Sequence, residues 1–147
     1  MGSEYDKGLP AADNTFASEI QPLLINTLAA GHLASLNAMQ PELKLTAAST
    51  SAEIASIYDE LIEILESFKI DPMSPDTTLI KQQLLAYTDS AFDSAYISWQ
   101  ISEHQKIISV FENRIADNEE TLLRRFALNH ISMLTLQLEE FKNVLAL

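Results

Sequence analysis

The sequence predicts an all-α protein, an up-down-up-down four-helix bundle. Only three of the 147 residues are Gly, whereas Leu (21) and Ala (17) make up about a quarter of the chain, and such a composition favours helix. Apolar residues recur at spacings of three and four, and no segment shows the period-two alternation of a half-buried strand. Four long amphipathic segments joined by short loops are typical of a bundle.

The chain divides into a short tail and one domain. We expect residues 1–13, which are polar, to form a flexible N-terminal tail that is in part typical of a recombinant leader. Residues 14–147 are long enough for a single bundle domain that needs no disulfide or metal to hold its core.

The first helix is expected to begin at Asn14 or Ser18 and to run to about Met39. Pro22 favours the start at Ser18, because proline is tolerated in the first turn of a helix. Pro41 is expected to end this helix, and a loop of about eight residues should follow it.

A capping box, Thr50-Ser51-Ala52-Glu53, predicts the start of the second helix. The residues after it carry an apolar stripe at helical spacing, and the prolines of segment 71–75 end it. The stripe consists of Ile54, Ile57, Tyr58, Leu61, Ile62, Leu65 and Phe68.

The third helix is expected from Ser74 or Asp76 to about Ile115, with a break into a short and a long piece at the weak helix formers of segment 88–90. The fourth helix should begin at Asp117, because Asp117 is a good N-cap and Glu120 follows three residues later. Trp99 is expected to widen the apolar seam of the third helix.

The charge balance limits the partners. There are 9 Lys and Arg against 21 Asp and Glu, which gives a net charge of −12. Binding to nucleic acid or to an anionic membrane surface requires clustered basic residues, and Arg124-Arg125 is the nearest approach to a cluster. We therefore expect no nucleic-acid partner, and a basic partner stays an open alternative.

Cysteine is absent, which excludes thiol catalysis, disulfides and thiolate metal sites. No apolar signal core follows the first residues, so any secretory signal would have been removed. Segment 20–41 has no charged residue and is long enough to span a bilayer. It contains many polar residues, so we expect an enclosed helix and no transmembrane span.

The common chemistries of helical bundles lack their motifs here. A di-iron carboxylate site needs two Glu-x-x-His motifs, and the chain has none; it also has no carboxylate between Glu19 and Glu42. There is no nucleophile elbow and no Gly-rich phosphate loop. The sequence therefore predicts a protein with no catalytic residues and no cofactor. Serine recurs every four residues in the third helix, at Ser90, Ser94, Ser98 and Ser102. We interpret this repeat as a small-residue face or a solvated face of the helix, and a polar groove is the alternative.

Three histidines, His32, His104 and His130, lie on or beside apolar stripes. A last hairpin centred near residue 117 places His104 and His130 at one level, and His32 could lie at the same end. A shared or water-bridged polar core pair, no contact at all, and a weak metal site for Zn, Cu or Fe are the three alternatives. A buried pair would lower the pKa of at least one ring.

A motif in the third helix resembles a known family. Phe92, Asp93, Tyr96, His104 and Phe111 match the Phe-Asp-x-x-Tyr, the His eight residues later and the closing Phe of a bacterial ferritin-like family of unknown function. Its members are often described as predicted outer membrane proteins. The resemblance implies a ferritin-like bundle that is exported across a membrane, and it implies no activity.

The chain also departs from that family. The family usually carries Glu in its first helix, Asp-His in its second and a late His in its last. Here those places hold Leu33-Ala34-Ser35, Asp59-Glu60 and Gln137. A metal site of that kind would have lost most of its ligands, so the five motif residues are read as structural.

Three functional hypotheses follow. The first is an exported, non-enzymatic helical bundle of the periplasm or cell envelope that binds or scaffolds an envelope protein or forms a homo-oligomer. The second is a ferritin-like binder of a metal or small ligand that uses the histidine layer. The third is a cytoplasmic helical interaction domain.

Overall fold

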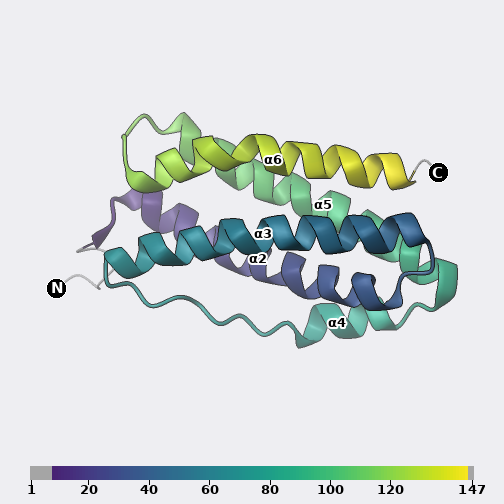
Figure 1. Ribbon diagram of the computed structural model, residues 1–147. Coiled ribbons are helices and arrows are strands. Elements are labelled where there is room, and N and C mark those ends of the chain that lie inside the picture. The colour runs from purple at the N-terminus through teal and green to yellow at the C-terminus, as the bar shows by residue number, and fades with distance from the viewer. Residues whose placement is uncertain (1–7, 146–147) are drawn as a thin grey trace.

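The computed structural model describes residues 8–145, and these contain five helices and no strand (Figure 1). The all-α expectation is therefore confirmed over this range. Four of the helices are long and pack along one another, and the fifth, α4, is short.

Helix α2 spans Ala11–Asn37. It begins three residues before the expected domain start at residue 14, because Asp13 is buried in the first turn instead of lying in a tail. Residues 1–7 of the expected tail lie outside the described residues. Pro22 lies in the helix interior and not in its first turn, so the start at Ser18 was wrong.

Helix α3 spans Pro41–Ser67. Pro41 is its first residue and not the end of the preceding helix, since the fixed φ of proline suits the first helical position. The expected eight-residue loop therefore shrinks to the residues between Asn37 and Pro41. Thr50 lies in mid-helix and donates its hydroxyl to the carbonyl oxygen of Thr46 at 2.8 Å, so it is not an N-cap.

The end of α3 is a Schellman motif. Lys69 adopts a φ of 60°, its amide bonds to Glu66 O at 2.9 Å, and the amide of Ile70 bonds to Leu65 O at 3.0 Å. The turn places Ile70 in the core and sends the following chain back along the molecule.

Helices α4 (Thr78–Leu85) and α5 (Asp89–Ala116) confirm the expected break at residues 88–90. Helix α6 spans Leu122–Leu145. Its N-cap is Thr121, whose Oγ1 accepts from the amide of Arg124 at 3.1 Å. Asp117 instead accepts from the amide of Glu119 within the loop, which corrects the expected start.

The up-down-up-down order was wrong. Asp93, near the start of α5, bonds to the turn between α2 and α3, and Arg114, near its end, pairs with Asp13 at the start of α2. Helix α5 is therefore antiparallel to α2 and parallel to α3. The connection after α3 and the short helix α4 together run the length of the molecule (Figure 1), so α5 begins at the opposite end.

The interior has two apolar halves. One contains the edge-to-face rings of Phe16, Phe111 and Phe126. The other contains Phe92, Tyr96 and Phe141. On each long helix, one or two buried polar residues separate the two halves: Thr27, Thr50, Gln100, His104 and Gln137.

Candidate functional site

The family-motif residues lie in the core. Phe92 and Tyr96, one helical turn apart, stack with ring planes 2° apart and centroids 6.3 Å apart. Both are at most 2% exposed, so the two rings pack together in the core. Phe111 is fully buried in the other apolar half. All three rings therefore serve packing between helices.

Asp93 fastens a turn far away in the sequence. Its two carboxylate oxygens accept from the amides of Met39 and Gln40 at 2.8 and 2.9 Å. These amides precede α3 and have no partner within the helix. The carboxylate thus holds the turn between α2 and α3.

A polar chain crosses the centre of the molecule. His104 Nδ1 lies 3.0 Å from the carbonyl oxygen of Gln100, and His104 Nε2 lies 2.9 Å from Gln137 Oε1. Gln137 Nε2 donates to Glu53 Oε1 at 3.0 Å. Gln100 Nε2 donates to the hydroxyl of Tyr96 at 3.1 Å. The chain joins helices α3, α5 and α6.

His104 is fully buried. Burial lowers its pKa below the ordinary value, and the bonds to Gln137 and Gln100 only partly oppose that effect. Both groups that face the ring are acceptors, so they favour the charged form, in which both ring nitrogens donate. Both ring nitrogens are therefore engaged within the protein.

The three histidines do not converge. His130 Nε2 lies 3.1 Å from Glu60 Oε2, at the edge of the molecule, and His32 is exposed on α2. His104 faces Gln137 and not His130. The two helices of the last hairpin therefore pair about a centre between residues 120 and 121 and not about residue 117. Within residues 8–145, no group of three or more His, Asp or Glu side chains could hold a metal ion.

The sequence analysis missed a buried ion pair. The side chain of Arg114 is fully buried; its Nε donates to Asp13 Oδ1, and Asp13 is 2% exposed. Its other nitrogens donate to the carbonyl oxygens of Asp117 and Glu119 and to Thr121 Oγ1 at 2.8–3.1 Å. The only sequence signal was an arginine in a mostly apolar seam.

Gly31 allows a close approach of α2 and α3. A Cβ at this position would lie 1.9 Å from Ser51 Oγ and 3.3 Å from Ser51 Cβ. The small pair Ala30-Gly31 therefore serves packing between helices.

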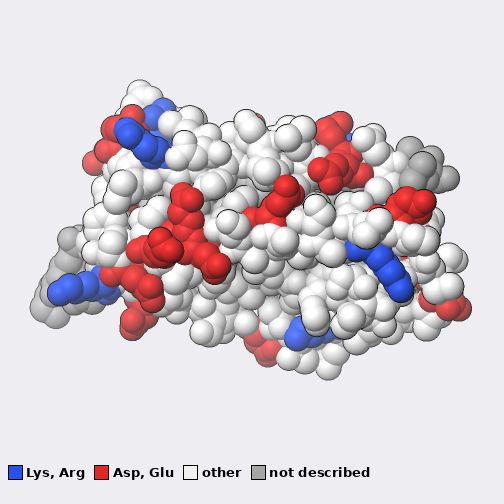
Figure 2. All heavy atoms as spheres, viewed as in Figure 1, with Lys and Arg blue, Asp and Glu red and all other residues white. Residues whose placement is uncertain are grey.

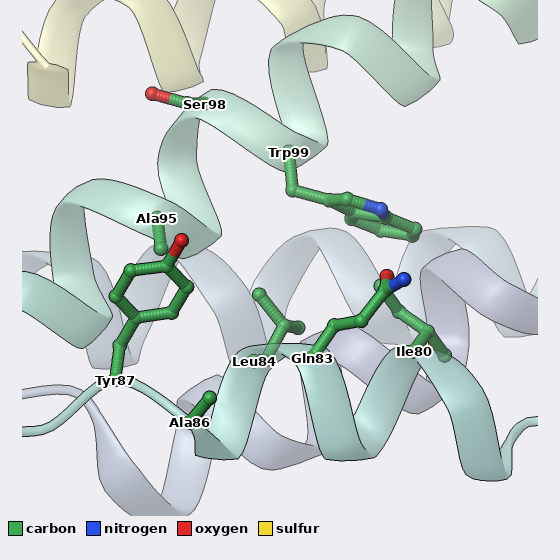
Figure 3. Close-up of a pocket in the computed structure, with 8 residues that line it drawn as sticks. All are labelled: Ile80, Gln83, Leu84, Ala86, Tyr87, Ala95, Ser98 and Trp99. Carbon is green, nitrogen blue, oxygen red and sulfur yellow. The ribbon is translucent and has the colours of Figure 1, made fainter.

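An open groove lies between α4 and α5. It has a volume of about 540 Å³, and its eight lining residues are shown in Figure 3: Ile80, Gln83, Leu84, Ala86, Tyr87, Ala95, Ser98 and Trp99. Tyr87 and Trp99 lie at opposite ends of it, with Leu84 between them (Figure 3). Its walls are apolar and aromatic, as in many small-molecule sites.

The groove was not predicted as a site. Trp99 widens the core seam as expected, since it packs against the apolar half that contains Phe92 and Phe141. It is only half-buried, however, and its ring also faces α4. The serine repeat is exposed, and only Ser98 reaches the groove. A signal was present in the sequence: Tyr87 follows α4, a helix of only eight residues that is too short to cover its neighbours.

The surface is strongly acidic. Figure 2 shows acidic side chains gathered over the C-terminal half of α3. That half carries Asp59, Glu60, Glu63 and Glu66. In the described part of the chain, no helix is both long and apolar enough to cross a bilayer.

Comparisons with known proteins give one result. Searches of curated proteins and of solved structures each found no match. A family model described as a domain of unknown function, DUF4142, matches residues 2–144. Because the match covers nearly the whole chain, the protein belongs to the DUF4142 family of domains of unknown function.

Proposed function

We propose that this protein is a non-enzymatic binding module of the bacterial cell envelope. One observation carries the proposal: the groove between α4 and α5 is open, apolar and flanked by Tyr87 and Trp99. Tyr87 is 51% exposed, and large exposed apolar side chains around a hollow are typical of binding surfaces.

The position of the polar residues supports binding over catalysis. His104, whose pKa is lowered by burial, is enclosed between the two apolar halves and has both ring nitrogens engaged. A general base must reach a proton of the substrate. Asp93 is likewise occupied by two backbone amides. The groove contains neither residue.

We also propose that the four long helices form a ferritin-like four-helix bundle. The support is the connectivity, since ferritin-like folds have one long crossover connection. Here the chain crosses the molecule once, between α3 and α5 (Figure 1).

The location in the periplasm or envelope rests on the family resemblance of the Phe92–Phe111 motif. A cytoplasmic location is the alternative. Fractionation of the source cells with an antibody against this chain separates them: we expect the protein in the periplasmic or envelope fraction, and recovery in the cytosol would contradict the envelope role.

Binding in the groove is tested by the fluorescence of Trp99, since the chain has one tryptophan. We expect the neutral probe butylbenzene to change this fluorescence in a saturable way. Ala95→Leu, which fills the groove, should weaken the response at least tenfold. Ala91→Leu makes the same change on the exposed face of α5 and should leave it unchanged. Equal responses in both variants would contradict the proposal.

A further inference from the structure

A second hollow extends the groove toward α2. It has a volume of about 250 Å³ and shares Ile80, Gln83 and Trp99 with the apolar groove. Its other lining residues are Asn26, Asp76, Leu79, Glu103 and Lys106. The combined site is therefore apolar from Tyr87 to Trp99 and polar beyond Trp99.

Two acceptors at the polar end lack a close hydrogen-bond donor. Asn26 Oδ1 is enclosed and has no donor within the protein. Glu103 has a side chain only 6% exposed, and one of its oxygens meets Lys106 Nζ at the long distance of 3.4 Å. Burial raises the pKa of Glu103, so its carboxylate is poorly compensated. Lys106 is 62% exposed and can turn away into solvent.

We propose that this site binds a small amphipathic ammonium compound, with its apolar or aromatic body between Tyr87 and Trp99 and its ammonium group donating to Asn26 Oδ1 and Glu103. The inference rests on the proposed function and names the ligand class of the same groove. An ammonium group has three donors and no acceptor, which complements the unpaired Asn26 Oδ1 and the weakly paired carboxylate of Glu103.

Charge favours a cation over an anion. Asp76 and Glu103 both line the polar end. Two lysines lie nearby: Lys106 pairs with Glu103, and the positive charge of Lys81 attracts the carboxylate of Asp76. The net charge of −12 raises the local concentration of cations. The indole face of Trp99 at the junction also attracts a cation.

The size favours a small molecule. A groove of about 540 Å³ lies within the range of about 300–1,000 Å³ that is usual for ligand pockets. Its length from Tyr87 past Trp99 suits a ring joined by a short alkyl chain to the amine.

Three probes of one shape test the inference: 4-phenylbutylamine, 4-phenylbutyrate and butylbenzene. Trp99 fluorescence gives the affinity, and the side-chain amide signals of Asn26 in ¹⁵N NMR spectra report contact at the polar end. We expect the amine to bind at least tenfold more tightly than the other two, since hydrogen bonds to charged groups are the stronger ones. The amine alone should shift the Asn26 signals.

Glu103→Gln keeps the shape and removes the charge, so it should weaken amine binding about tenfold and leave butylbenzene unchanged. Asn26→Ser should weaken the amine in the same direction. Glu112→Gln is the matched control, because Glu112 is an exposed residue of α5 outside the groove.

The outcomes separate the two proposals. If butylbenzene binds as tightly as the amine, the inferred ammonium ligand is wrong and the proposed binding function stands. If 4-phenylbutyrate binds most tightly, Lys106 selects an anion and the inference is overturned. If no probe binds, both the inference and the proposed function fail.

Discussion

Asp93 links the start of α5 to the turn before α3, and its replacement gives a graded test of that role. The side chain is 3% exposed and accepts two amide hydrogen bonds of 2.8 and 2.9 Å. A hydrogen bond to a charged group contributes about 1.5–3 kcal/mol. Met39 is 59% exposed, so water can replace part of the lost bonding and the lower value applies.

Asp93→Ala should therefore reduce the free energy of unfolding by about 3 kcal/mol, and Asp93→Asn by about half as much, because the amide oxygen retains one acceptor. For a chain of this size, about 3 kcal/mol corresponds to a decrease in Tm of roughly 6–12 °C. Urea denaturation with a fixed m-value measures the free-energy change.

A local measurement accompanies the global one. Hydrogen exchange of the Met39 and Gln40 amides should accelerate in Asp93→Asn more than exchange elsewhere. Asp59→Ala, on the exposed face of α3, is the control and should change stability by less than about 0.5 kcal/mol. If Asp93→Asn behaves like this control in both assays, the carboxylate does not hold the turn.

Three further predictions concern the core. Phe92→Ala should cost about 3–5 kcal/mol because the ring is 2% exposed, and an unchanged Tm would refute its role in packing. Arg114→Met should cost about 3–5 kcal/mol in urea denaturation by leaving Asp13 buried without its partner, whereas the exposed Arg125→Met should be nearly neutral. Burial lowers the pKa of His104 below 6.5, so the unfolded chain binds more protons than the folded protein, and the free energy of unfolding should fall as the pH decreases from 6.5 toward the folded-state pKa. Thermal melts from pH 7 to pH 4 should show that the unchanged protein loses more stability in acid than His104→Leu does. Equal losses in the two proteins would contradict this prediction.

Much of the local structure is predictable from the sequence, because helix formation depends on neighbours along the chain. The period of the apolar residues predicts helices without strands, and the weak helix formers at residues 88–90 predict the break between α4 and α5. The spacing of Phe92 and Tyr96 by one turn predicts their shared face. Local signals become ambiguous at Pro41, since proline after one helix is also a favoured first residue of the next.

The candidate site was less predictable. Trp99 reads as a core residue because its spacing matches the apolar seam, and only the shortness of α4 leaves it uncovered. Asn26 belongs to no recognisable sequence motif. Its side-chain oxygen lacks a partner because of its place in the folded protein, where α2 borders the hollow beside α4 and α5.

The sequence by itself determined the helices, their apolar faces and the family motif. The tertiary structure alone decided the direction of α5, which depends on whether the segment after α3 turns back or crosses the molecule. It also decided that His104 contacts Gln137 and not His130. A shift of three to four residues in the centre of the last hairpin moves the residue opposite His104 by about two turns of helix. The pairing of Arg114 with Asp13 joins residues 101 positions apart. Such contacts depend on the packing of whole helices, which no local pattern encodes.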